Sequence, residues 1–179
     1  MTVSPNAEGA GLRPAVLADR GQVHAWLVKA YESPFFCVEQ RPPSREEFLA
    51  DYEELFFTDR SPRQGRVFII TRDGADTGAV SYDARHHGPG RADVDIWLAE
   101  EALCGRGRGG AALGLLWPYL RGRIGLRRAL MSPCARNLRA VRCYEKAGFK
   151  PLGYLPRREL ERRYGPLDCP HALVMERPL

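Results

Sequence analysis

Hydrophobic residues recur at helical spacing in two stretches near the start of the chain, 18–33 and 44–57. In the first stretch the apolar face is formed by Val23, Trp26, Leu27, Ala30 and Tyr31. In the second stretch it is formed by Phe48, Tyr52, Leu55 and Phe56. Apolar positions three and four residues apart lie on one side of a helix, so both stretches are predicted to be helices. Ser44 with Glu47 fits a capping box, which predicts where the second helix begins.

The remaining stretches alternate between strand and helix signals. We predict a hairpin that turns at Asp73–Gly74, two further helices and five further strands. The hairpin spans 65–84, the helices 111–120 and 137–148, and the strands 11–16, 92–99, 127–133, 149–156 and 172–177. Pro118 should bend or shorten the third helix, and Gly148 should end the fourth. The order β-α-α-β-β-β-α-β-α-β-β indicates a mixed α/β fold in one domain over 1–179, with 1–10 as a loose tail.

The composition is that of a soluble globular protein. Of the 179 residues, 44% are hydrophobic and 27% are charged, which is enough apolar material for one full core. The first residues lack the basic and apolar segments of a secretory signal, and no run is long enough to span a membrane. The five cysteines are scattered without a C-x-x-C pair, so we expect neither disulfides nor a metal site. We expect a cytoplasmic protein, either a monomer or a homodimer.

The chain has a net charge of +5, and nearly all of its basic residues are arginines. Arginine also binds the phosphates of nucleic acids. The arginines are dispersed through every segment, and no nucleic-acid-binding motif accompanies them. We therefore expect no nucleic-acid partner. An arginine-rich nucleic-acid-binding module remains the alternative from another functional class.

A glycine-rich segment, "GRGRGG" at 105–110, precedes the third predicted helix. Glycines before a helix N-terminus allow backbone N–H groups to bind a phosphate. The segment matches G-x-G-x-x-G, but a dinucleotide fold needs an acidic residue about 20 positions later, and none lies between 111 and 144. The G-K-[ST] of a nucleotide-triphosphate loop is absent. A pyrophosphate bound by backbone N–H groups remains, and coenzyme A carries one.

Two stretches resemble the GNAT superfamily of acyl-CoA-dependent N-acyltransferases. In "DIWLAEEALCGRGRGGAAL" a strand leads into a loop like R/Q-G-x-G-x-G, although Cys104 stands at the first position. "NLRAVRCYEKAGF", residues 137–149, meets N-x-x-A-x-x-x-Y-E-K-x-G-F at every named position. This second stretch and the opening "LRPAVLADRGQVHAWL" are most similar to the aminoglycoside 6′-N-acetyltransferases. The resemblance implies a GNAT-like fold, acetyl-CoA as cofactor and a link to antibiotic resistance.

The resemblance also implies roles for individual residues. Acetyl-CoA would lie against Leu98, Ala99, Leu103, Gly105, Arg106, Gly107, Arg108, Gly109, Gly110, Asn137, Ala140 and Tyr144. Tyr144 would be the general acid that protonates the departing thiolate. Asn137 would hold the pantetheine arm or cap its helix. A backbone N–H near Leu98–Ala99, where the strand splays, would stabilise the oxyanion.

The acceptor side is predicted from the same strand and from the region of the first two helices. Asp95 is the candidate base or amine anchor, and alternation along the strand predicts that it shares a face with Asp93 and Trp97. The residues expected to bind the acceptor are Trp26, Tyr31, Phe35, Phe36, Asp93, Asp95 and Trp97. The acidic residues of the second helix are either a solvated face or an attraction for a polycation.

Together these features predict an acetyl-CoA-dependent N-acetyltransferase in which an amine attacks the thioester directly. The expected acceptor is a small polyamine-type molecule, with an aminoglycoside first. The alternative is a peptide or protein N-terminal amine, as in ribosomal-protein alanine acetyltransferases. A coenzyme-binding domain without activity is a further alternative, against which Tyr144 speaks.

Overall fold

The computed structural model describes residues 9–33, 41–152, 158, 162 and 172–179. Its elements are β1 (Ala10–Pro14), α1 (Arg20–Glu32), α2 (Arg45–Asp51), β2 (Gly65–Arg72), β3 (Ala75–Asp83), β4 (Arg91–Leu98), α3 (Arg108–Tyr119), β5 (Arg128–Met131), α4 (Leu138–Lys146), β6 (Lys150–Pro151) and β7 (Met175–Pro178). The order of helices and strands is the predicted one, and the mixed α/β fold is confirmed. The segment expected to be a loose tail lies mostly outside the described residues, and β1 begins at Ala10.

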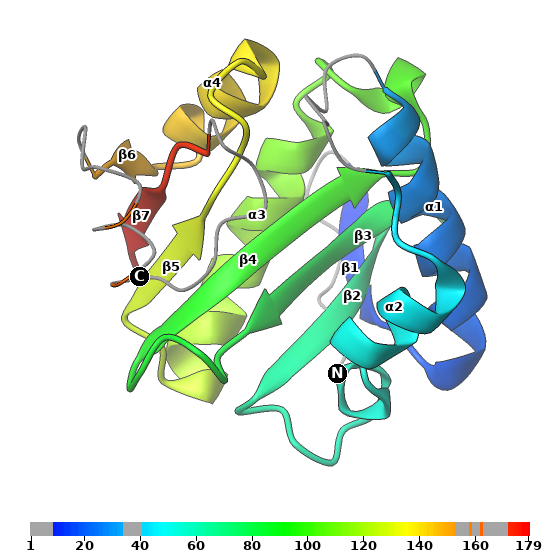
Figure 1. The fold of residues 1–179 in the computed structure, drawn as a ribbon, viewed down its shortest axis with the longest axis horizontal. Coiled ribbons are helices and arrows are strands. Elements are labelled where there is room, and N and C mark those ends of the chain that lie inside the picture. The colour runs from blue at the N-terminus through cyan, green and yellow to red at the C-terminus, as the bar shows by residue number, and fades with distance from the viewer. Residues whose placement is uncertain (1–8, 34–40, 153–157, 159–161, 163–171) are drawn as a thin grey trace.

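Seven strands form one sheet in the order β1-β2-β3-β4-β5-β7-β6. Among the strands that the structure describes, β4 and β5 alone run parallel, and their pairing ends where Asp93 lies opposite Leu130. Beyond that point the two strands diverge, as Figure 1 shows. The chain crosses from β4 to β5 through α3, so the start of α3 lies close to this opening.

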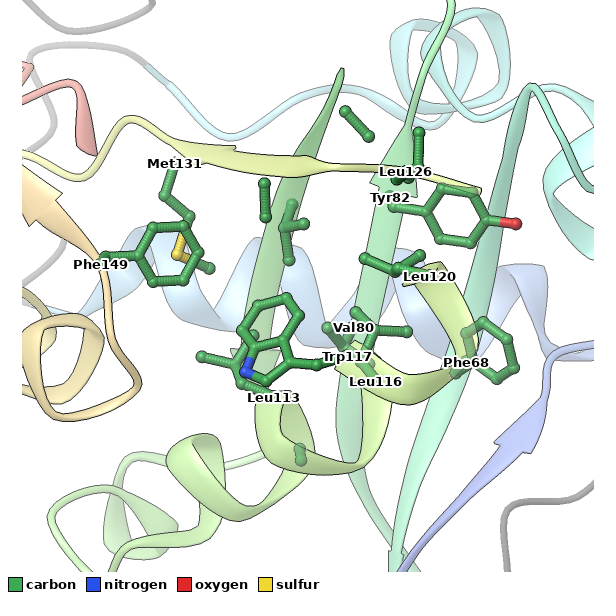
Figure 2. Close-up of a cluster of buried hydrophobic side chains, with 14 of the residues drawn as sticks. Phe68, Val80, Tyr82, Leu113, Leu116, Trp117, Leu120, Leu126, Met131 and Phe149 are labelled. Atoms are coloured by element: carbon green, nitrogen blue, oxygen red, sulfur yellow. The ribbon is translucent and has the colours of Figure 1, made fainter. Parts of the chain in front are cut away.

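Helices cover the two faces of the sheet (Figure 1). One core lies between the sheet and α3, where Leu113, Leu116 and Trp117 pack against strand residues such as Phe68 and Val80 (Figure 2). The second core lies on the opposite face, where α1 and α2 pack against β2, β3 and β4. None of the described helices is long and apolar enough to span a bilayer.

The predicted hairpin and the predicted cap of the second helix, α2, are both observed. Asp73 (φ 51°) and Gly74 (φ 82°) both have the positive φ angles that tight two-residue hairpin turns require. The Ser44 hydroxyl accepts from the Glu47 N–H at 3.2 Å, and the Glu47 carboxylate accepts from the Ser44 N–H at 2.7 Å. The capping box is therefore confirmed.

The second helix is shorter than predicted, because α2 ends at Asp51 and only a 3-10 turn follows over Glu54–Phe57. Tyr52 leaves the helical region with φ −101° and ψ 71°. This break lets consecutive residues Phe56 and Phe57 both enter the core. Arg20 of α1 donates to the carbonyl of Tyr52 at 2.9 Å, which satisfies a group that the helix end leaves without a partner.

Pro118 lies inside α3 and does not end it. The helix runs to Tyr119 and then widens into a π-type turn over Leu120–Ile124. A proline removes one helical N–H, which is consistent with this change of pitch within the next turn.

Candidate acetyl-CoA and amine site

The opening between β4 and β5 leads into a cavity of about 660 Å³. Its walls are the end of β4, the glycine segment, the first turn of α3, one side of α4 and the C-terminal end of α1. Of the twelve predicted coenzyme contacts, the cavity is lined by Leu98, Ala99, Gly105, Gly107, Arg108, Gly109, Gly110, Asn137, Ala140 and Tyr144. The structure therefore brings these residues together around one space.

The glycine segment has the geometry of a phosphate loop. Gly105 (φ 73°) and Gly107 (φ 75°) adopt left-handed conformations, and Gly107 caps α3. The first helical hydrogen bond runs from the Ala111 N–H to the Gly107 carbonyl at 3.0 Å. The amides before Ala111 therefore have no intrahelical acceptor, and the positive end of the helix dipole lies beside them.

The two arginines of the glycine segment, Arg106 and Arg108, differ in whether they line the cavity. Arg108 lines the cavity, and its Nε is buried without a hydrogen-bond acceptor among the described residues. Such an atom fits an oxygen of the pyrophosphate, because a buried guanidinium N–H without an acceptor is costly. Arg106 is exposed and does not line the cavity, so only Arg108 gains support from the structure.

Further charged residues line the cavity. The sequence offers Glu100 and Glu101 as loop alternatives to Asp95 for the base, and both line the cavity. The sequence analysis did not select Lys29, Arg139, Arg142 and Lys146, which line it as well. Glu101 bridges two walls, since it accepts from the Ser33 hydroxyl at 2.7 Å and from Arg139 at 3.4 Å. The three-residue spacing of Arg139 and Arg142 on one side of α4 was a signal that could have been noticed. The excess of cations suits a polyanionic coenzyme.

Asn137 directly precedes α4, and Tyr144 lies within this helix. The Asn137 side chain accepts from the Ala140 N–H at 3.0 Å, so it caps the helix. Burial raises the pKa of Tyr144 above its ordinary value, and the nearby Cys143 and Asp95 add to the increase. The phenol therefore stays protonated at physiological pH, as a proton donor must.

The end of β4 presents backbone donors to the opening, and the register shows which of the two expected oxyanion donors is available. The Ala99 N–H is occupied, since it donates to the Thr77 carbonyl at 3.0 Å. Leu98 pairs with Gly78 of β3, and successive amides of a strand point to opposite edges. The Leu98 N–H therefore faces the side of β4 where β5 diverges. Of the two expected oxyanion donors, Leu98 and Ala99, the Leu98 N–H is the one that can serve, because the Ala99 N–H is already bonded.

Asp93, Asp95 and Trp97 share the face of β4 that looks toward α2. Trp97 belongs to the core under α1 and α2, whereas Val94 belongs to the core under α3. Trp97 also lines the cavity, whereas Asp93 and Asp95 do not. The predicted alternation is therefore observed.

Tyr52 lies close enough to Asp95 for the two groups to interact electrostatically, although the sequence analysis assigned Tyr52 only to the apolar face of the second helix. Its ring lies 5.9 Å from that of Trp97. Burial raises the pKa of Tyr52, and the Asp95 carboxylate raises it further. The same carboxylate raises the pKa of Tyr144, so Asp95 acts electrostatically on both the coenzyme side and the α2 side.

The other predicted contacts are dispersed. Trp26 is buried under α1 and Leu103 packs at the edge of the same core. Tyr31 belongs to α1 but does not line the cavity. Phe35 and Phe36 lie outside the described residues.

A β4 strand that splays from β5, a glycine loop at a helix start and a cationic cavity define an acyl-CoA-dependent N-acyltransferase. The acetyltransferase (GNAT) domain family matches residues 10–150, so the chain belongs to this family. The predicted family, its acyltransferase activity and acetyl-CoA as donor are thus confirmed.

Similar proteins carry more specific names. The aminoglycoside N(6′)-acetyltransferases type 1 of Klebsiella pneumoniae and Serratia marcescens are each 27% identical over 162 residues, covering 84% of this chain and 79% of theirs. The structure of AAC(6′)-Ib with ribostamycin and coenzyme A has a TM-score of 0.69 at 22% identity, covering 95% and 93% of the two chains. The ribosomal L7/L12 acetyltransferase RimL with coenzyme A has a TM-score of 0.74 at 17% identity, covering 100% and 98%.

Proposed function

We propose that this enzyme acetylates a primary amine of a small polycationic acceptor, an aminoglycoside, by direct attack on acetyl-CoA. The observation that carries this proposal is the pair of carboxylates, Asp93 and Asp95, on the face of β4 that they share with Trp97, which lines the cavity. Carboxylates at this edge attract ammonium groups. The aminoglycoside acetyltransferases named above, which are similar over most of the chain, support the same acceptor.

Bound acetyl-CoA supplies a thioester at the end of β4, and residues of this chain act on it. Asp95 accepts a proton from the ammonium and frees the amine to attack. The Leu98 N–H donates to the oxygen that gains negative charge. Tyr144 donates its phenolic proton to the departing thiolate. No covalent enzyme intermediate is needed, because a deprotonated amine that is aligned with a thioester attacks it directly.

The acids of α2 contribute less to this attraction than their number suggests. Glu47 of α2 is paired with Arg41, and Glu53, which follows α2, shares Arg85 with Asp83. The charge of Glu47 is therefore compensated within the chain, that of Glu53 is compensated in part, and the acceptor is held chiefly by Asp93 and Asp95 of β4.

The test compares kcat/KM for kanamycin A with that for short peptides carrying a free N-terminal Ala or Ser, by thiol release from acetyl-CoA. We expect kanamycin A to be the better acceptor by at least about tenfold, which corresponds to about 1.4 kcal/mol of transition-state binding. A peptide that exceeds kanamycin A would instead favour N-terminal protein acetylation. Heat-denatured enzyme and acetyl-CoA alone give the background rate.

A further inference from the structure

The indole N–H of Trp97 is a buried donor without an acceptor, and the residue belongs to the wall of the cavity. Trp97 is 5% exposed, and its Nε1 atom has no hydrogen-bond partner among the described residues. The same residue lines the cavity. Buried indole N–H groups usually find an acceptor, and one that lacks an acceptor lowers stability. Trp97 therefore carries a donor that a ligand in the cavity can satisfy.

Trp97 lies where the cavity meets the core under α1 and α2. Of the residues in that core, Ala30, Trp97 and Ala99 line the cavity, and among these three only Trp97 has a polar side-chain atom. The Tyr52 ring packs edge-on against the indole, with the ring centroids 5.9 Å apart. This packing restricts the rotation of the indole and gives its N–H a fixed direction, as recognition of one particular atom requires.

The chemistry of the indole defines the kind of group that it can bind. An indole N–H donates and cannot accept, so its partner must be an acceptor atom, which is an oxygen in most polar ligands. The charged amine of an acceptor molecule has only donors at its nitrogen, so the amine itself cannot be this partner. The partner is therefore a second group of the bound molecule.

The position of Trp97 on β4 favours the amine substrate over the coenzyme as the source of this oxygen. Trp97 shares its face of β4 with Asp95, and their Cα atoms lie about 7 Å apart along the strand. The Leu98 N–H, which serves the thioester in the proposed reaction, faces the side where β5 diverges. An oxygen near Trp97 thus belongs to the molecule whose amine lies at Asp95.

The two candidate acceptors both carry an oxygen close to the reacting amine. In kanamycin A the carbon of the 6′-amine is bonded to a carbon that bears the ring oxygen. In a peptide the N-terminal nitrogen and the first carbonyl oxygen are likewise separated by two carbon atoms. A plain alkylamine has no oxygen at this position.

We propose that the Trp97 indole N–H donates a hydrogen bond to an acceptor oxygen two carbons from the reacting nitrogen, and so selects amino sugars and amino amides over plain alkylamines. This inference deepens the proposed function. It rests on the N-acetyltransferase reaction with the amine at Asp95, and not on the choice between an aminoglycoside and a peptide. Trp97 is then a binding residue that determines specificity.

Kinetics with two acceptors test this selection. Trp97→Phe keeps an aromatic ring in the core and removes the N–H, so it should lower kcat/KM for kanamycin A about tenfold. The same variant should change kcat/KM for 1,6-diaminohexane, which has no oxygen, by less than about twofold. The control Trp117→Phe removes an indole from the core under α3, which does not line the cavity, and should leave the ratio of the two values unchanged (Figure 2).

The indole N–H signals of isotope-labelled wild-type enzyme give a second measurement, which does not require Trp97→Phe to fold. The chain has three tryptophans, so Trp26→Phe and Trp117→Phe assign the Trp97 signal by elimination. With coenzyme A bound, kanamycin A should move the Trp97 signal downfield, because the N–H gains an acceptor. Coenzyme A alone and 1,6-diaminohexane should leave the signal in place.

Three results would overturn the inference: a Trp97 signal that no oxygen-bearing acceptor moves, a signal that moves with coenzyme A alone, or an equal loss of kcat/KM for both amines in Trp97→Phe. The proposed function can fail separately. If the wild type acetylates a peptide N-terminus but not kanamycin A, the proposed acceptor is wrong, and the same comparisons of that peptide with 1,6-diaminohexane then decide the role of Trp97.

Discussion

Tyr144 lies in the α4 segment that resembles the family motif, and it also lines the cavity at the end of β4. Its ring packs against Phe149 with centroids 6.2 Å apart, which fixes the ring without engaging the hydroxyl. A raised pKa keeps this phenol protonated through the physiological range. These features suit a residue that donates a proton late in the reaction.

Tyr144→Phe should lower kcat by about 100-fold and leave the affinity for acetyl-CoA almost unchanged. The ring and its packing remain, and only the proton donor is lost. Single-turnover rates with kanamycin A measure the chemical step, and equilibrium binding of coenzyme A serves as the control. An unchanged single-turnover rate would assign Tyr144 to packing alone.

Asp95→Asn should lower kcat/KM most at pH values below the pKa of the acceptor amine, where a proton must be removed. At higher pH the free amine is already abundant, so the defect should shrink. A pH–rate profile of kcat/KM between about pH 6 and 9 makes the comparison. A profile with the wild-type shape and a uniform decrease would leave Asp95 as an amine anchor only.

Arg13 illustrates a residue that stabilises the fold without reaching the site. It pairs with Asp19 at 2.8 Å and with Asp76 at 2.6 Å, and so ties β1 to the turn before α1 and to β3. The Arg13 guanidinium lowers the pKa of Asp19 below its ordinary value. The stabilisation is therefore complete above the unfolded-state pKa near 3.9 and is lost as the pH falls through the lower folded-state value.

Asp19→Asn should accordingly lower the free energy of unfolding by about 1–2 kcal/mol at pH 7, and the difference from wild type should diminish below about pH 4. Urea denaturation at several pH values provides the measurement. A difference that is constant down to pH 2 would show that the charge of Asp19 is not what stabilises the fold.

At the scale of elements, the order of helices and strands was predictable because each element carries its own signal. The Asp73–Gly74 turn and the Ser44 cap depend on local chemistry, and both appear where the sequence predicts them. The break at Tyr52 was not predictable, because its cause is the burial of Phe57 and the contact from Arg20 of α1. Local periodicity contains neither interaction.

The candidate site shows the same division between local and tertiary information. The glycine loop and α4 carry contiguous motifs, so the residues they contribute to the cavity were predictable. Lys29, Ser33 and Tyr52 reach the site only through the packing of α1 and α2 on the sheet. The occupied Ala99 N–H depends on the β3–β4 register, which the sequence does not specify residue by residue.

The loop before α3 should bind the pyrophosphate of acetyl-CoA through its backbone. Gly107→Glu should abolish the increase in melting temperature that acetyl-CoA gives the wild type, because a carboxylate and a strained φ enter the phosphate site. Gly114→Glu, an exposed position on the same helix, is the matched control and should retain the increase. An increase caused by NAD or ATP but not by acetyl-CoA would contradict the assigned ligand.

In the whole molecule, the cavity lies where the sheet opens between β4 and β5, the parallel pair among the described strands. Cationic side chains of α1, α3 and α4 line the cavity, whereas Asp93 and Asp95 lie on the face of β4 that looks toward α2. Under the proposed function, a polyanionic donor would meet the cationic lining and a polycationic acceptor would meet the two carboxylates. The net charge of +5 does not describe this separation, because it averages over both faces.

NMR analysis of the product formed from isotope-labelled acetyl-CoA and kanamycin A tests the proposed reaction most directly. We expect one acetyl group on the primary 6′-amine for each coenzyme A released, with no label on the protein. Absence of labelled kanamycin A while the enzyme acetylates a peptide N-terminus at a substantial rate would contradict it.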